Sequence, residues 1–276
     1  MPVAPVEEFL SGTGGKIFIR TWKPAGAPKA VIAICHGFNS HSGQYEWVAQ
    51  QFAAAGYVVY ALDLRGRGKS DGERFFVDHV DEYVSDLSLL IRTAKSREPG
   101  LKVFLLGHSA GGVISCSYTL DNQQELAGLI CESFAFRVPA PKLALDAIKG
   151  ISSFAPRLPV LTLHNKDFSR DPAAVATLNA DPLIAHETQP AETVAALWRA
   201  DERLTKEFPT IRIPVLIMHG THDKATVPAG SQFFFDTTGS TDKTLKMYEE
   251  HFHDLFNDYG KEQVMADTLA WVGARA

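Results

Sequence analysis

Ser109 stands between two glycines in the segment Gly107-His-Ser-Ala-Gly111. A serine that attacks a carbonyl group must be exposed at a sharp bend, and glycines on both sides leave room for that bend. The pattern by itself is common, but here the apolar run 102–106 leads into it and small residues follow it. This strand–turn–helix context predicts that Ser109 is a nucleophile for acyl transfer. A phosphate-binding loop would carry a lysine at its end, whereas valine follows the glycines here.

A serine hydroxyl needs a base, and the chain has ten histidines that could serve. His253 follows the last predicted strand and comes after the candidate acids. Enzymes that carry their serine on such a strand–turn–helix usually have the chain order nucleophile, acid and histidine. His251 lies two residues away and remains an alternative base. His108 precedes the serine by one position, so we expect its side chain to point away from the site and to form a structural hydrogen bond.

Asp223 is the predicted acid, because it follows the apolar run 214–218, at the carboxyl end of a strand. An acid at this place would hold the imidazole in the correct tautomer and stabilise its positive charge. Glu132 also follows an apolar run and is a rival. Asp63 is a second rival, although it precedes the nucleophile and is expected, with Arg65, to stabilise the glycine-rich turn after it.

Acyl transfer also needs N–H groups that bind the negatively charged oxygen of the intermediate. We expect one from Ala110, directly after the nucleophile. The second is expected from Phe38, in the loop after the predicted strand 30–35, where Gly37 would let the backbone come close.

The elements that must position these groups form an alternating series. The predicted strands are 16–21, 30–35, 57–63, 102–106, 126–131, 214–219 and 243–249, and predicted helices include 45–55, 80–95 and 261–272. Runs that are apolar almost throughout are typical of parallel strands covered on both faces. We therefore expect an α/β fold, with a mostly parallel, doubly wound sheet and helices on both faces.

Residues 134–208 interrupt this series with recurring prolines and short helical pieces. We expect them to form an inserted helical cap, or lid, on a core of residues 1–133 and 209–276. The first half of the insertion is apolar, and its Leu143, Leu145 and Ile148 are predicted to bind substrate. We also expect it to make transient contact with a membrane or micelle.

The composition and charge of the chain limit the classes of partner and cofactor that we expect. The net charge is −5 and no stretch is dense in Lys or Arg, which argues against a nucleic acid partner. The three cysteines lie in apolar or small-residue runs and are expected to be buried, reduced thiols. No metal-ligand spacing is present, so we expect no metal and no cofactor. The N-terminus lacks a signal-peptide pattern and no apolar run could span a bilayer, so we expect a soluble, cytoplasmic protein.

Taken together, these segments resemble the monoacylglycerol lipase and lysophospholipase branch of the α/β-hydrolase superfamily. The resemblance lies in the segments His36-Gly-Phe-Asn-Ser-His-Ser-Gly-Gln-Tyr45, Asp63-Leu-Arg-Gly-Arg-Gly-Lys-Ser70 and His253-Asp-Leu-Phe-Asn257, together with Ser169-Arg-Asp-Pro172 and Asn179-Ala-Asp-Pro-Leu183 in the insertion. It implies the α/β-hydrolase fold, the triad Ser109, Asp223 and His253, and a substrate-binding role for His41. The chain departs from the family pattern at Ala110, where methionine is common.

The resemblance implies hydrolysis of single-acyl esters, that is monoacylglycerols, lysophospholipids or simple carboxylic esters, as the small-molecule substrates. The same triad could serve a short-chain carboxylesterase, a thioesterase, a peptidase or an acyltransferase. A binding protein that keeps the fold without turnover is a further alternative.

Overall fold

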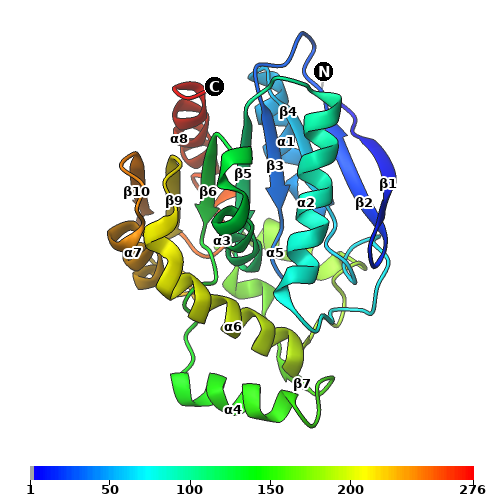
Figure 1. Cartoon of the computed structure of the whole chain (residues 1–276), viewed down its shortest axis with the longest axis vertical. Coiled ribbons are helices and arrows are strands. Elements are labelled where there is room, and N and C mark those ends of the chain that lie inside the picture. The colour runs from blue at the N-terminus through cyan, green and yellow to red at the C-terminus, as the bar shows by residue number, and fades with distance from the viewer. Residues whose placement is uncertain (1–2) are drawn as a thin grey trace.

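The computed structural model describes residues 3–276, so the first two residues of the predicted core and N-terminal segment lie outside it. Its centre is a sheet in the order β1-β2-β4-β3-β5-β6-β9-β10 (Figure 1). The strands are β1 Val6–Gly12, β2 Gly15–Trp22, β3 Val31–Cys35, β4 Val58–Leu62, β5 Val103–His108, β6 Gly128–Glu132, β9 Val215–Gly220 and β10 Lys243–Tyr248. In the part of the sheet from β4 to β10, all neighbouring strands are parallel. At the other end, β2 pairs antiparallel with both β1 and β4. The mostly parallel sheet is confirmed.

Helices cover both faces of this sheet. The central strands β3, β4, β5, β6 and β9 are buried at every residue, which explains why their sequences are apolar rather than alternating. Helices α1 (Glu46–Ala54) and α8 (Lys261–Gly273) pack on one face. Helices α2 (Val80–Arg97), α3 (Ala110–Asn122) and α7 (Pro228–Thr237) pack on the other. The doubly wound arrangement follows, with the carboxyl ends of the parallel strands at one edge.

The edge strand β1 was not among the predicted strands. It pairs with β2 from Val6 opposite Thr21 to Gly12 opposite Gly15, and Phe9 stacks edge-on against Phe18 at 5.2 Å. Its outer position leaves many of its side chains exposed, so its sequence carries two glutamates and no clear alternation. Pairing with a neighbour, rather than its own pattern, makes it a strand.

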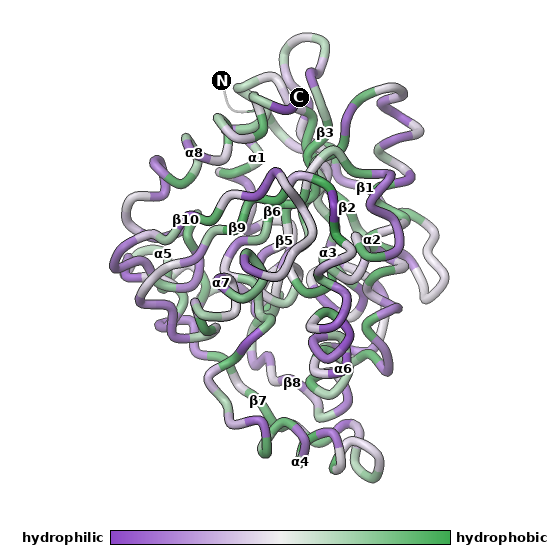
Figure 2. Tube along the Cα trace, turned by 60° about the vertical axis from the view of Figure 1, so that its left-hand side comes forward, coloured by the Kyte–Doolittle hydropathy of each residue, from purple (hydrophilic) through white to green (hydrophobic). Residues whose placement is uncertain are grey.

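The segment between β6 and β9 holds the inserted elements. These are α4 (Lys142–Ser152), β7 (Pro159–Leu161), α5 (Pro172–Ala180), β8 (Gln189–Pro190) and α6 (Ala191–Glu207). Strands β7 and β8 pair with each other and not with the main sheet. Helix α6 packs on α2, α3 and α4, while α4 and β7 project from the body of the molecule (Figures 1 and 2). The insertion contacts the core through α6 and also through the ion pairs Arg67–Glu187 and Arg170–Asp258.

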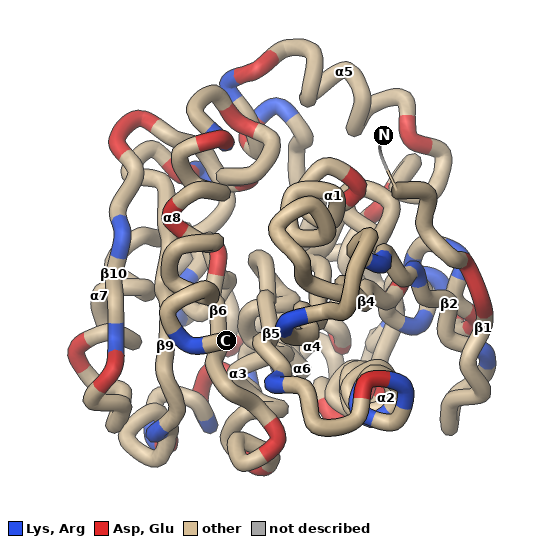
Figure 3. Tube along the Cα trace, turned by 90° about the horizontal axis from the view of Figure 1, so that it is seen from above, with Lys and Arg blue, Asp and Glu red and all other residues tan. Residues whose placement is uncertain are grey.

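Neither sign of charge dominates one part of the described chain. Acidic and basic residues are interspersed around the molecule in the view from above (Figure 3), in line with the small net charge of −5. None of the described helices is both long and apolar enough to cross a bilayer.

Candidate active site

Ser109 occupies the turn between β5 and α3 in a strained backbone conformation. Its φ is 54° and its ψ is −124°, a region that residues other than glycine rarely adopt. A Cβ at Gly107 would lie 2.4 Å from the Ser115 hydroxyl oxygen, and one at Gly111 would lie 2.2 Å from the Cys35 carbonyl oxygen. The two glycines are therefore required by neighbouring atoms, and the turn they permit brings Ser109 to the wall of a cavity.

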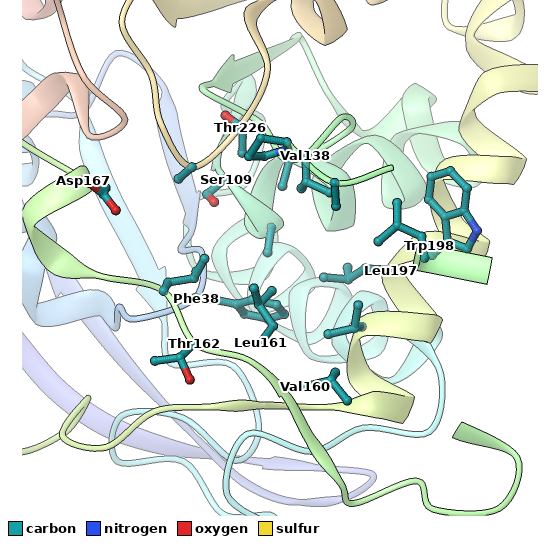
Figure 4. Close-up of a pocket in the computed structure, with 18 of the residues that line it drawn as sticks. Phe38, Ser109, Val138, Val160, Leu161, Thr162, Asp167, Leu197, Trp198 and Thr226 are labelled. Carbon is teal, nitrogen blue, oxygen red and sulfur yellow. The ribbon is translucent and has the colours of Figure 1, made fainter. Parts of the chain in front are cut away.

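Two backbone N–H groups lie beside this serine. Ala110 is the first residue of α3, so its N–H has no partner within the helix. The loop after β3 comes so close that a Cβ at Gly37 would lie 2.7 Å from the Ser109 Cβ. Phe38, the next residue, lines the same cavity as Ser109 and Ala110 (Figure 4). Within residues 3–276, neither the Phe38 nor the Ala110 N–H donates a hydrogen bond. The two groups are available to an anionic oxygen.

The Phe38 ring rests on a buried cation. The Arg67 guanidinium lies 4.0 Å from the centre of this ring and forms an ion pair with Glu187 of the insertion. The Glu187 carboxylate also accepts a hydrogen bond of 2.9 Å from the Asn39 N–H. Asn39, with a positive φ of 51°, follows Phe38 directly. The insertion therefore fixes the loop that carries the Phe38 amide.

His253 and Asp223 form a buried hydrogen-bonded pair. Asp223 follows β9 and His253 follows β10, and the His253 Nδ1 lies 2.8 Å from the Asp223 Oδ2. The other ring nitrogen, Nε2, is buried without a partner in the described chain. His251, the alternative base, instead places its Nδ1 2.9 Å from the Glu249 carbonyl oxygen.

The Asp223–His253 pair lies next to the serine turn. The His108 ring lies 4.9 Å from the His253 ring, centre to centre. The Thr226 hydroxyl, 3.4 Å from the His253 Nδ1, belongs to a residue that lines the same cavity as Ser109 (Figure 4). His108 does form the expected structural hydrogen bond, at 3.0 Å to the Tyr45 hydroxyl. Its ring packs against His253, but His108 is not among the described residues that line the cavity.

Asp223 receives more hydrogen bonds than the sequence suggested. Its Oδ1 accepts the backbone N–H groups of residues 225 and 226 at 2.8 and 2.9 Å. Its Oδ2 accepts the Thr226 hydroxyl at 2.8 Å and lies 3.0 Å from the Nε2 of a second histidine, His219. Burial raises the pKa of Asp223, but His253 and His219 lower it more strongly, so the carboxyl is held well below its usual pKa. The ionised form is thereby favoured.

Sequence reasoning missed His219. It lies near the end of β9, four residues before Asp223, and its Nδ1 is 2.7 Å from the Ser231 hydroxyl. The signal that could have found it is a histidine at the carboxyl end of the strand that precedes the acid.

The rival acids have other partners. The Glu132 Oε1 accepts the Leu255 N–H at 2.8 Å, and burial, with Asp254 nearby, raises the pKa of Glu132 well above its usual value. Asp63 accepts the backbone N–H groups of Ser42 and Lys69, both at 2.8 Å. Neither carboxylate is hydrogen-bonded to a histidine within the described residues.

One buried cluster consists of three side chains of the types that bind metal ions. Donor atoms of His108, Glu132 and Asp254 lie within 4.8 Å of one another. The His108 Nε2 and the Glu132 Oε2 have no partner in the described chain, whereas Asp254 accepts a hydrogen bond of 2.8 Å from Asn257. The three residues come from three separate segments, so no spacing in the sequence revealed the group.

The cavity beside Ser109 has a volume of about 370 Å³ and is lined largely by apolar side chains of the insertion. Leu145 and Ile148 of α4 are part of its wall. Leu143 and His41 were predicted to bind substrate, but the structure places neither of them at the cavity. Leu143 is 81% exposed, and His41 lies 2.8 Å from Asp181, as part of the contact between the loop and the insertion. Neither lines the cavity in the described chain.

Comparisons with known proteins agree with this geometry. A family model described as serine aminopeptidase, S33, matches residues 26–260. The monoacylglycerol lipase of Mycolicibacterium smegmatis is 34% identical over 96% of both chains, and the monoglyceride lipase of Rattus norvegicus is 31% identical over the whole of this chain and 92% of its own. The crystal structure of Paleococcus ferrophilus monoacylglycerol lipase superposes with a TM-score of 0.85 at 29% identity, covering 94% of this chain and 99% of that one. The chain therefore belongs to the serine aminopeptidase S33 family of α/β-hydrolases, in the branch that includes monoacylglycerol lipases.

Proposed function

We propose that this protein hydrolyses esters of a single acyl chain, with monoacylglycerols as the first substrates to test, through an acyl-enzyme on Ser109. The observation that carries the proposal is the buried Asp223–His253 pair beside a serine that opens into an apolar cavity. Family membership makes the chain a carboxylic ester hydrolase, and the names of two relatives, a monoacylglycerol lipase and a monoglyceride lipase, support the choice of substrate.

The proposed reaction has two steps. The Ser109 Oγ attacks the ester carbonyl carbon while its proton passes to the His253 Nε2. The carbonyl oxygen becomes an anion that accepts hydrogen bonds from the Phe38 and Ala110 N–H groups. His253 then gives its proton to the leaving alcohol oxygen. In the second step His253 takes a proton from water, the hydroxide attacks the acyl carbon, and the fatty acid leaves as the Ser109 hydroxyl is restored.

We assign residues 134–208 the role of a cap that binds the acyl chain. The apolar wall made by α4 and α6 would take an alkyl chain out of water at a gain of about 0.8 kcal/mol per buried methylene. The ion pair of Glu187 with Arg67 would hold the cap against the loop that carries Phe38. Cap position and the supply of the Phe38 N–H are thus coupled in this proposal.

Labelling and turnover test the proposal together. A fluorophosphonate probe is expected to label the wild type and not Ser109→Ala. Ser117→Ala, which removes a hydroxyl bonded only to the Val113 carbonyl oxygen of the same helix, is the control and should label normally. Turnover is then measured on a monoacylglycerol, a lysophospholipid and p-nitrophenyl esters of increasing chain length. Equal labelling of Ser109→Ala, or no labelling at all, would support the non-catalytic binding protein instead.

We also propose that α4 touches lipid surfaces. Leu143, near the start of α4, is 81% exposed, and Phe154, two residues beyond the end of α4, is 92% exposed. Helix α4 projects from the body of the molecule (Figure 2), and exposed apolar residues on such an element are typical of interaction sites. The variant Leu143→Ser/Phe154→Ser is expected to lose co-sedimentation with phosphatidylcholine vesicles and to keep hydrolysis of a monomeric short-chain ester. Phe9→Ser, at a half-exposed position in the edge strand β1, is the matched control. Unchanged vesicle binding of the double variant would contradict the contact.

A further inference from the structure

The cavity wall contains one carboxyl group that the proposed reaction does not use. Asp201 lies on α6 and lines the cavity together with Leu145, Ile148 and, from its own helix, Leu197 and Trp198. Figure 4 shows Leu197 and Trp198 on the α6 side of the cavity, across from Ser109. The carboxyl group therefore belongs to the apolar part of the wall rather than to the catalytic groups.

No side chain of the described protein satisfies this carboxyl group. Asp201 is only 7% exposed, and neither of its carboxyl oxygens has a hydrogen-bond partner in the described chain. Its Oδ1 has no accessible surface, so a ligand in the cavity would reach the carboxyl group through Oδ2. The nearby donors are engaged elsewhere: the Trp198 indole N–H donates to Asp146 at 3.0 Å, and the Thr205 hydroxyl donates to the Asp201 backbone carbonyl oxygen. A buried polar group without a partner destabilises the folded protein, so such a group usually has a ligand or a function.

The surroundings decide what kind of group could bind there. Burial alone raises the pKa of Asp201 well above its usual value, since no cation lies beside it to lower it. In its protonated form a carboxyl group offers one O–H donor as well as acceptor lone pairs. A substrate hydroxyl matches both, whereas an ammonium group would have to give up its hydration among Leu145, Ile148 and Leu197.

We propose that Asp201 is a specificity-determining residue that binds a hydroxyl group carried on the acyl chain of the substrate. The inference rests on the proposed function, because it assumes that the cavity holds the acyl part of an ester cleaved at Ser109. It predicts that esters of hydroxylated acyl chains are preferred over esters of plain alkyl chains. A hydroxylated chain forms a hydrogen bond with the buried carboxyl group, whereas a plain alkyl chain leaves that group without a partner.

The test compares p-nitrophenyl dodecanoate with a set of its hydroxy derivatives, in which the hydroxyl is moved from the terminal carbon toward the carboxyl group in separate esters. An ester with a terminal ammonium group completes the set. The value measured is the ratio of kcat/KM for each derivative to that for the plain ester, in the wild type, Asp201→Asn and Asp201→Leu. Ile148→Ala enlarges the same cavity without changing its polar groups and is the matched control.

The wild type is expected to prefer at least one hydroxy ester by about 3- to 10-fold, the effect of one neutral hydrogen bond. Asp201→Asn should keep a preference because its amide both donates and accepts. Asp201→Leu should reduce the ratio to one or less, mainly by faster hydrolysis of the plain ester, and Ile148→Ala should leave the ratio unchanged.

Three results would overturn the inference. These are a wild type that prefers no hydroxy ester, the same ratio in Asp201→Leu as in the wild type, and a preference for the ammonium ester. In each of them a fluorophosphonate would still label Ser109, so the proposed function would stand. Absence of both labelling and ester hydrolysis would instead refute the proposed function and this inference with it.

Discussion

Replacing Asp223 by asparagine should nearly abolish hydrolysis while leaving the fold intact. The carboxylate has five polar contacts. Its Oδ1 accepts hydrogen bonds from two backbone N–H groups, and its Oδ2 accepts hydrogen bonds from the His253 ring and the Thr226 hydroxyl and lies 3.0 Å from the His219 Nε2. Asparagine has one side-chain oxygen, so its NH₂ group must take the place of either Oδ1 or Oδ2. The backbone N–H groups at Oδ1 can only donate a hydrogen bond, whereas the imidazoles and the hydroxyl at Oδ2 can also accept one. The NH₂ group is therefore expected at the Oδ2 position.

An NH₂ group there donates to the His253 Nδ1, so the ring proton must move to Nε2. A protonated Nε2 cannot accept the proton of the Ser109 hydroxyl, and the negative charge that stabilises the imidazolium is gone. In a serine protease the same substitution lowers kcat about 10⁴-fold, which corresponds to about 5 kcal/mol of transition-state stabilisation. We expect a loss of that order here.

The assay is kcat/KM for a p-nitrophenyl ester, with circular dichroism to check folding. Glu132→Gln is the matched control, because Glu132 is a second buried acid at a strand end and its Oε1 accepts a hydrogen bond from a backbone N–H rather than from a histidine. It should keep activity within about threefold of the wild type, since its hydrogen bond to the backbone survives in glutamine. More than a tenth of wild-type activity in Asp223→Asn, or an equal loss in Glu132→Gln, would refute the assignment of the acid.

Four further outcomes are expected. Gly37→Ala places a Cβ 2.7 Å from that of Ser109, so it should displace the Phe38 amide and lower kcat by about 10²–10³; an unchanged kcat would show that this amide is not used. Glu187→Ala leaves the buried guanidinium of Arg67 unpaired, and urea unfolding should report a loss of about 3–5 kcal/mol, against a smaller loss for Glu187→Gln. Because burial raises the pKa of Glu132 above its unfolded value near 4.5, the folded chain keeps a proton that the unfolded chain releases, and stability falls as the pH rises above that value. Glu132→Gln removes this term, so its Tm relative to the wild type should be higher at pH 8 than at pH 5, and parallel Tm curves would contradict the shift. All three cysteines are buried and free, so the native protein should not react with Ellman's reagent, whereas the unfolded protein should expose three thiols.

Much of the fold could be predicted because the central strands carry their own signal. A strand covered on both faces must be apolar along its whole length, and the runs that became β3, β4, β5, β6 and β9 are of this kind. The serine turn was only partly local: Gly107 is required by atoms of the turn and the helix after it, whereas Gly111 is required by the Cys35 carbonyl oxygen of a distant strand. The edge strand β1 carried no such signal.

The cap shows where local pattern is insufficient. Leu143, Leu145 and Ile148 all belong to the apolar set of one helix, and the sequence treats them alike. In the structure, Leu145 and Ile148 are three residues apart and share the face of α4 that lines the cavity, while Leu143 points to solvent. Which face of α4 is covered depends on how the helix packs against α6, and that is a property of the folded molecule.

By itself, the sequence determined the central parallel strands and the serine turn, and it supplied Ser109, Asp223 and His253 as candidates for nucleophile, acid and base. Only the tertiary structure decided that Asp223 contacts both His253 and His219, that Glu132 and Asp63 have other partners, and that Asp201, without a hydrogen-bond partner in the described chain, is a residue of the cavity wall. The physical reason is that strand and turn preferences arise between neighbours in the chain. Hydrogen bonds among buried polar groups instead join segments that are far apart in sequence, and their partners are fixed only when the strand ends converge.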